Sequence, residues 1–276
     1  MKIRFQNSPA ETRVMNTQDL RSNFLIESLM QVDQIEVIYS HYDRLVIGGA
    51  VPKSKNIFLP NEDELRANYF LERREIGIIN VGGKGTITAD GKVYEMDKLD
   101  CLYLGKGTKE VYFASIDESS PAYFYFLSSL AHLSFPNQKF TKEQASPICL
   151  GDILTSNKRT IYKYIHADGI QSCQLVMGLT CLEAGSVWNS VPPHIHTRRM
   201  EAYFYFDLPD SQRVFHFMGE PQETRHLVIA NHEVAISAPW SMHFGVGTSN
   251  YSFIWGMAGE NMEFSDMDPH PITTLK

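Results

Sequence analysis

The 276-residue sequence lacks features that define several other classes of protein. No apolar run reaches the length of a membrane span, and residues 1–13 contain no apolar core of a signal peptide. Acidic residues outnumber basic ones by 32 to 25, giving a net charge of −7, whereas a surface that binds nucleic acid is basic. We therefore expect a cytoplasmic protein that binds neither nucleic acid nor membrane.

Cysteine is also scarce. The four cysteines, Cys101, Cys149, Cys173 and Cys181, include no Cys-x-x-Cys pair. A chain of this length buries enough apolar surface to fold without disulfides. We expect these thiols to be reduced and mostly buried, and their spacing argues against a zinc site built from cysteine.

The sequence does contain, from about residue 75 onward, short β-rich runs separated by turn residues, which is typical of an all-β sandwich or barrel. In the first half, the predicted strands cover residues 76–81, 86–89, 92–95, 99–104 and 110–115. The pattern returns in the second half, with predicted strands that include residues 161–165, 174–180, 214–218, 226–230, 233–237 and 251–255.

This repetition predicts two tandem β-barrels with a few short helices, one barrel in residues 1–145 and the other in 146–276. The polar, proline-bounded segment 134–147 is predicted to connect them. A helix is expected over 18–30, with Thr17 or Asp19 as its N-cap.

Metal-binding residue types gather in the second half. His194 and His196 are separated by one residue, Glu201 follows, and His243 ends the segment 239–243. Residues two apart on a strand point to the same face, so the two imidazoles would converge. Glu201 has the wrong parity to join them on one straight strand, which predicts a bend through 197–199.

After that bend, residues 201–206 are predicted to form a second strand that presents Glu201, Tyr203 and Tyr205 to one face. Three imidazoles and a carboxylate suit Zn²⁺ and equally suit Mn²⁺ or Fe²⁺. The alternative is that His194 and His196 are exposed loop histidines that follow two prolines. The first half has no equivalent set, so we expect it to serve as a metal-free scaffold for packing and assembly.

Paired barrels with this His-x-His-x4-Glu motif and a later histidine resemble the cupin superfamily. Gly185 stands further from the histidines than the leading glycine of the first cupin motif does, and Ser241-Met242 replaces the usual glycine of the second. Longer strings narrow the match to the 5-keto-4-deoxyuronate isomerase family, which the chain resembles over nearly its whole length. These strings include residues 43–49, 75–83, 173–180, 198–206, 219–226 and 253–261.

The resemblance implies a cytosolic, zinc-dependent, hexameric isomerase of pectin breakdown. Such an enzyme would convert 5-dehydro-4-deoxy-D-glucuronate into 3-deoxy-D-glycero-2,5-hexodiulosonate, with one metal per subunit held by His194, His196, Glu201 and His243. The four ligands alone leave two other classes open. These are a cupin-type metal-dependent oxygenase or decarboxylase, and a sugar-binding cupin without catalytic activity.

A carboxylate on the substrate is best bound by a bidentate cation, for which arginine is better shaped than lysine. Arg159 and Lys163 share a strand face that leads toward the metal residues, and Arg198 and Arg199 flank the predicted bend. Next to His243, two further side chains are expected to line the pocket, Trp240 and Met242.

The base that transfers the proton is not identifiable from spacing, because it must lie within about 3 Å of the carbon-bound proton that it removes. Glu183, Glu260, His226 and Tyr205 are candidates, and a surface or structural role competes with each of them.

Overall fold

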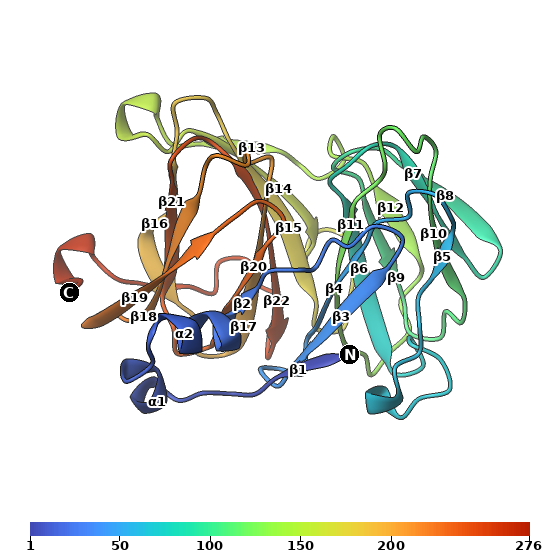
Figure 1. Cartoon of the computed structure of the whole chain (residues 1–276), viewed down its shortest axis with the longest axis horizontal. Helices are drawn as coiled ribbons and strands as arrows, with labels where there is room; N and C mark the ends of the chain where they lie inside the picture. Colours follow the sequence, from blue (N-terminus) through green and yellow to red (C-terminus); the bar gives the residue numbers. More distant parts are fainter.

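The computed structural model describes residues 1–276, which form two β-barrels side by side (Figure 1). The strands of the first barrel are β1 (Lys2–Arg4), β3 (Ile35–Ser40), β4 (Val46–Ala50), β5 (Ile57–Phe58), β6 (Arg74–Asn80), β7 (Gly85–Ala89), β8 (Lys92–Met96), β9 (Cys101–Leu104), β10 (Val111–Ser115), β11 (Phe124–Leu130) and β12 (Gln138–Phe140). They form a seven-stranded sheet of order β1-β3-β4-β11-β6-β9-β12 and a four-stranded sheet of order β5-β10-β7-β8.

The strands of the second barrel are β2 (Leu25–Ile26), β13 (Ile148–Leu150), β14 (Arg159–Ile165), β15 (Val176–Leu182), β16 (Trp188–Ile195), β17 (Arg199–Phe206), β18 (Val214–Glu220), β19 (Glu223–Ile229), β20 (Val234–Ser237), β21 (His243–Gly247), β22 (Ser252–Gly259) and β23 (Asp268–Pro269). Their sheets have the orders β13-β14-β15-β22-β17-β20-β2 and β19-β18-β21-β16-β23. The prediction of an all-β chain with two barrels is confirmed. The boundary at residue 145 stays a prediction, and β2 shows that the N-terminal segment reaches across to the second barrel.

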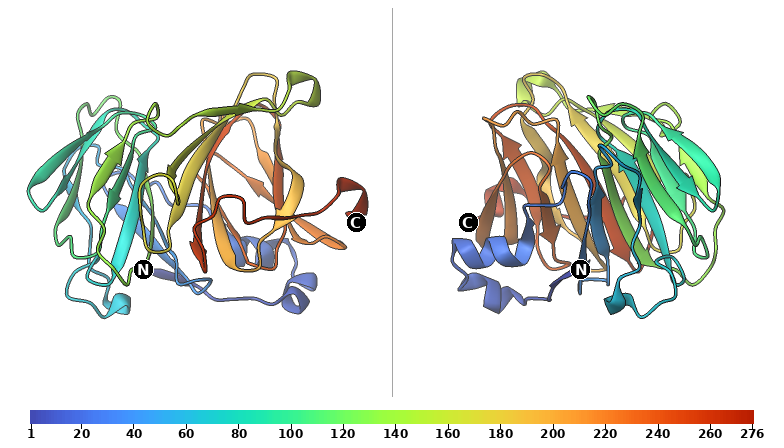
Figure 2. Two further views of the ribbon diagram at one scale, coloured as in Figure 1. Left: turned by 180° about the vertical axis from the view of Figure 1, so that it is seen from behind. Right: turned by 45° about the vertical axis from the view of Figure 1, so that its right-hand side comes forward.

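The helices are α1 (Pro9–Arg13), α2 (Thr17–Phe24) and the 3-10 turns η1 (Asp63–Leu65), η2 (Ile153–Thr155) and η3 (Ile272–Thr274). Both α-helices lie against the second barrel, as the blue segment in Figures 1 and 2 shows. No helix is both long enough and apolar enough to cross a membrane.

The predicted helix over 18–30 corresponds to α2, but its cap and its end differ from the prediction. The N-cap is Asn16, which forms a capping box with Asp19: each side chain accepts a hydrogen bond from the other residue's backbone N–H. The helix ends at Phe24 because Leu25 takes up an extended conformation and pairs with Ala235 in β20. Pairing with the second barrel therefore overrides continued helix formation.

The two barrels pack through their seven-stranded sheets, and their central strands are consequently buried on both faces. Every residue of β17 is buried. Its Phe204 stacks on Tyr125 of β11, with ring centroids 4.5 Å apart, while Glu201 and Tyr203 face the interior of the second barrel. Glycine permits this close approach, since a Cβ on Gly256 would lie 2.1 Å from the Leu127 side chain.

The carboxylate of Glu75 in β6 joins the two barrels through several hydrogen bonds. It is fully buried and accepts hydrogen bonds from the backbone N–H groups of Cys173, Gln174 and Leu175, at 2.7–3.0 Å. The hydroxyls of Tyr103 and Ser129 also donate to it. This carboxylate therefore satisfies three backbone donors, partly or fully buried, in the segment that leads into β15.

All four cysteines are free thiols. The expectation that they are mostly buried is wrong, because only Cys101 is buried. Cys173 and Cys181 are half-buried, and Cys149 is exposed on β13, the edge strand of its sheet.

Candidate metal centre

Strand pairing brings the histidine and glutamate side chains together. His194 near the end of β16 is the register partner of His243 at the start of β21. The chain then bends after His196, and β17 runs back with Glu201 between β20 and β22. The predicted bend therefore exists, and β16 reaches it through a bulge between Asn189 and His194, which accommodates two prolines that cannot donate to the sheet.

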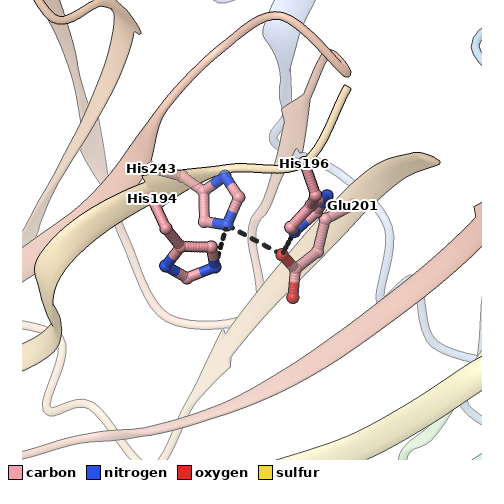
Figure 3. Close-up of side chains that lie close together, drawn as sticks. All are labelled: His194, His196, Glu201 and His243. Atoms are coloured by element: carbon pink, nitrogen blue, oxygen red, sulfur yellow. Dashed lines mark hydrogen bonds and ion pairs between the residues drawn. The ribbon is translucent and has the colours of Figure 1, made fainter. Parts of the chain in front are cut away.

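The four side chains converge on one point in the interior of the second barrel (Figure 3). One ligand atom from each residue lies within 4.8 Å of the others. The Glu201 Oε2 atom is 2.9 Å from Nε2 of His196 and 2.9 Å from Nε2 of His243, and Nε2 of His243 is 3.0 Å from that of His194. All three histidines thus direct Nε2 toward the same place.

In His196 and His243, contacts of the outer ring nitrogen, Nδ1, favour the tautomer that can bind a metal through Nε2. Nδ1–H of His196 donates to the backbone carbonyl of Arg199 at 3.1 Å, and Nδ1 of His243 faces the carbonyl of Ser241 at 3.4 Å. A proton on Nδ1 leaves the lone pair on Nε2, the inner nitrogen, and such outer contacts orient metal-binding histidines. His196, Glu201 and His243 are at most 3% exposed. The donor set and its orientation fit a divalent cation with nitrogen and oxygen ligands.

The electrostatics favour these protonation states at His194 and Glu201, whereas at His196 the hydrogen bond and charge of Glu201 outweigh burial and raise the pKa of the imidazole. Burial, together with the neighbouring His243, lowers the pKa of His194 to about 3, so this imidazole is neutral near pH 7. Burial alone would raise the pKa of Glu201. The His243 and His196 imidazoles beside its carboxylate outweigh that effect and hold this pKa well below its usual range. Neutral imidazole and ionised carboxylate are the forms that bind metals.

A cavity of about 350 Å³ opens beside the cluster. Its walls are mainly apolar, and the lining residues with a formal charge are Arg159, Arg199 and Glu201. Because Glu201 is directed at the histidines, the charges left for a ligand are positive. The cavity therefore suits a small anionic molecule that also contacts the cluster.

Of the six residues considered as substrate contacts, two line this cavity, Arg159 and Arg199. Arg159 is half-buried on β14, and its Nη1 donates to the carbonyl of Asn157 at 2.9 Å. No carboxylate pairs with it, and burial lowers the pKa of its guanidinium. An arginine without an acidic partner at the cavity wall is available to an anionic ligand.

The other four predicted contacts lie elsewhere. Lys163 sits over the ring of Phe264, 5.3 Å from its centroid, and Met242 is fully buried. Trp240 donates from Nε1 to the carbonyl of Asn7 and packs edge-on against Phe24. Arg198 forms ion pairs with Asp266 and Asp268 at 2.6 and 2.8 Å. None of the four lines the cavity, and their roles in binding stay predictions.

None of the four base candidates lines the cavity either. Glu183 pairs with Lys158 at the surface, and His226 and Glu260 are exposed. Tyr205 faces the barrel interior but bonds to His216, with 2.7 Å between its hydroxyl and Nδ1. The cavity wall therefore contains none of the proton-transfer groups that the sequence suggests.

A segment that the sequence interpretation did not place at the site covers part of the cavity. Residues 260–267, here called the strap, run between β22 and β23 and contribute Phe264, Ser265 and Met267 to the lining. The strap is held by both arginines of the bend: Arg198 pairs with Asp266, and Arg199 donates to Asn261 Oδ1 and to the Asp266 carbonyl. The signal for this segment in the sequence is the string 253–261, which resembles the isomerase family and extends into the strap.

The ion pair with Arg198 and the hydrogen bond from Asn261 lower the pKa of Asp266 to about 2. The carboxylate that fastens the strap thus remains ionised far below neutral pH. Arg199 is fully buried beneath the strap, and its Nε has no hydrogen-bond partner.

Comparison with known proteins gives relatives along the full length of the chain. The chain is 54% identical over 276 residues to 4-deoxy-L-threo-5-hexosulose-uronate ketol-isomerase of Shouchella clausii, covering all of both chains. It is 50% identical over 278 residues to the protein of the same name from Escherichia coli O45:K1, again with full coverage of both.

Solved structures show the same fold at low sequence identity. An IolB-like protein from Salmonella typhimurium has a TM-score of 0.68 at 14% identity, over 90% of this chain and 97% of that one. The oxalate decarboxylase of Lactobacillus farciminis, solved as a formate complex, has a TM-score of 0.62 at 10% identity, over 89% and 88%. These similarities establish the paired-barrel architecture but carry no activity over to this chain.

The family model described as the KduI/IolB family matches residues 24–272, which include both barrels and all four residues of the cluster. That match, together with full-length relatives at 50–54% identity, is sufficient to assign the family. This chain belongs to the KduI/IolB family.

Proposed function

We propose that this chain is a metal-dependent aldose–ketose isomerase that converts 5-dehydro-4-deoxy-D-glucuronate into 3-deoxy-D-glycero-2,5-hexodiulosonate. The observation that carries the proposal is the full-length identity of 50–54% to ketol-isomerases of that uronate. The site supports it, since a cavity of positive charge adjoins a cluster suited to a metal. Neither the decarboxylase nor the sugar-binding alternative has support beyond a shared fold.

His194, His196, Glu201 and His243 would hold the metal, and we propose Zn²⁺, with Mn²⁺ or Fe²⁺ as the alternatives to be tested. When bound, the ion supplies a Lewis acid for the negative charge that develops on the substrate oxygens during isomerisation. The residues of the chain exclude water and hold the cluster in place. Apolar lining residues such as Phe253, Trp255 and Met257 exclude water from the reacting carbons, and the bend and β17 keep the cluster rigid.

The activity is tested by incubating the metal-loaded protein with 5-dehydro-4-deoxy-D-glucuronate in deuterated water and following the reaction by NMR. We expect conversion to the 2,5-diulosonate, and solvent deuterium in the product would indicate proton transfer through an enediol. If metal-loaded protein gives no conversion, the isomerase proposal is wrong.

We expect Arg159 to bind the carboxylate of the substrate. Arg159→Gln should therefore raise KM by about 10- to 100-fold, the effect of losing one charge-assisted pair, and change kcat much less. Steady-state kinetics of the isomerisation measure both constants. Arg213→Gln is the matched control, because Arg213 is exposed and bonds only to backbone carbonyls. An unchanged KM for Arg159→Gln would remove Arg159 from the site.

We further propose that the protein is a cytoplasmic homo-oligomer that acts in the degradation of pectin and other polyuronides. The resemblance to the isomerase family implies that the oligomer is a hexamer. The first barrel, residues 1–145, would be the scaffold for assembly and residues 146–276 the catalytic barrel. In support, Phe58, Tyr112 and Val93 are exposed on the outer sheet of the first barrel, and Phe58 and Tyr112 are register partners. Sedimentation that gives the mass of a single chain would contradict the assembly.

A further inference from the structure

One buried phenol, that of Tyr203, lines the cavity beside the cluster. Tyr203 follows Glu201 by two residues on β17, so both side chains point into the barrel. Its ring is held on several sides: it stacks on Phe253 with centroids 5.3 Å apart, and it lies 5.3 Å from the ring of His243 and 5.4 Å from that of His216. The ring therefore has little freedom to move its hydroxyl away from the cavity.

The hydroxyl of Tyr203 is weakly bonded for a buried polar group. Tyr203 is only 3% exposed. Its hydroxyl has one hydrogen bond, to Ser190 Oγ at 3.4 Å, and a weaker contact with the Glu201 carboxylate. Hydrogen bonds between hydroxyls are normally about 2.7–2.8 Å long, so the contact with Ser190 is poor. A phenol has one proton to donate and can also accept. Its capacity to bond is thus largely unused, although burial makes an unused donor unfavourable.

The other polar groups of the cavity wall are committed, differ in chemistry or lie away from the cluster. Three of them belong to the cluster. Ser190 contacts Tyr203 itself, and Ser265 is exposed on the strap. Thr180 Oγ1 accepts from Trp255 Nε1 at 3.2 Å, and Arg199 is fully buried under the strap and bonded to it. Arg159 suits the carboxylate end of a ligand. Tyr203 is therefore the hydrogen-bond donor of the wall that is fixed beside the cluster and free to act on a ligand there.

We propose that the Tyr203 hydroxyl is a catalytic hydrogen-bond donor to an oxygen of the enediolate that forms from the keto-deoxyuronate. This inference rests on the proposed function. In an aldose–ketose isomerisation by proton transfer, a proton leaves the hydroxyl-bearing carbon and one is delivered to the adjacent carbonyl carbon. Between these two transfers, negative charge spreads over the oxygens of both carbons. A fixed donor bonds more strongly to that charge than to the neutral carbonyl of the substrate, and this difference accelerates the reaction. Ser190 serves as the partner of the hydroxyl when no ligand is bound.

Tyr203→Phe removes the donor and keeps the ring. We expect kcat to fall by about 10²- to 10³-fold, the effect of losing one oxyanion-stabilising hydrogen bond, with KM changed by less than about threefold. Metal content and melting temperature should match those of the unmodified protein. Tyr205→Phe is the matched control, since Tyr205 faces the same interior from the same strand but bonds to His216 and does not line the cavity. Its kcat should stay within about threefold of the original.

A binding measurement separates catalysis from structure. The monohydroxamate of xylaric acid carries a carboxylate and mimics an enediolate, whereas D-galacturonate mimics only the ground state. By calorimetry on metal-loaded protein, Tyr203→Phe should lose affinity for the hydroxamate by nearly the factor lost in kcat, and should retain its affinity for galacturonate. Equal losses for both ligands, or none for the hydroxamate, would overturn the assignment.

The two proposals fail in different ways. Absence of turnover in the unmodified, metal-loaded protein contradicts the proposed function, whereas full turnover in Tyr203→Phe contradicts only the role of Tyr203. Should Tyr203→Phe not fold, 3-fluorotyrosine introduced at position 203 keeps the hydroxyl and reports on it. We expect its fluorine resonance to shift when the hydroxamate binds, and an unshifted resonance under saturation would overturn the inference.

Discussion

Glu201→Gln should abolish both metal binding and turnover, with kcat/KM reduced by about 10³-fold or more. The Glu201 carboxylate is the one negative charge among the four ligand residues, and its Oε2 lies 2.9 Å from Nε2 of both His196 and His243. An amide of the same shape cannot balance a divalent cation in a buried site. Elemental analysis of the purified protein measures the metal, and steady-state kinetics measure the turnover.

The matched control for this variant is Glu118→Gln. It changes net charge by the same amount at an exposed position far from the cluster. We expect it to bind metal and turn over like the unmodified protein. If Glu201→Gln kept a full equivalent of metal and near-normal activity, the carboxylate would not be a ligand, and the role given to the cluster would need revision.

Glu75→Ala should destabilise the whole chain by about 3–5 kcal/mol, because it leaves several buried donors unpaired at once. The backbone N–H groups of residues 173–175 and the hydroxyls of Tyr103 and Ser129 lose their common acceptor. For a protein of this size the melting temperature should fall by roughly 10 °C. Differential scanning calorimetry of the metal-loaded protein measures the change.

The control for Glu75 is Glu95→Ala, which removes an exposed carboxylate that pairs with Lys84 at the surface. Exposed ion pairs contribute little, so we expect a change within about 0.5 kcal/mol. Glu75 contacts the start of β15 and not the cavity, so the folded fraction of Glu75→Ala should keep its kcat. A melting temperature equal to that of Glu95→Ala would show that this carboxylate does not join the barrels.

The fold and the cluster were predictable from sequence because both depend on local periodicity. Alternation and turn residues mark most strands, and the parity of His194, His196 and Glu201 requires a bend where the structure has one. The central strands were harder to interpret, since β6 and β17 are buried on both faces and lose the alternation that a half-exposed strand shows. The end of α2 at Phe24 was not predictable because it depends on pairing with a distant strand.

Most contacts with substrate could not be predicted from the sequence, because they depend on which side chains face the interior of the second barrel. Trp240 stands three residues before His243 yet packs against α2. Arg198 follows the ligand histidines yet fastens the strap through Asp266, about 70 residues later in the chain. Tyr203, in contrast, was predicted to share a face with Glu201, and that parity was the available signal for its place in the cavity.

Removal and return of the metal tests the central claim most directly. A chelator is used to strip the protein, and isomerisation of 5-dehydro-4-deoxy-D-glucuronate is measured before and after one equivalent of Zn²⁺ per chain is restored, with Mn²⁺ and Fe²⁺ in parallel. We expect the stripped protein to be folded and inactive, and one equivalent of a divalent ion to restore turnover. Full activity in protein shown to be free of metal would contradict the account.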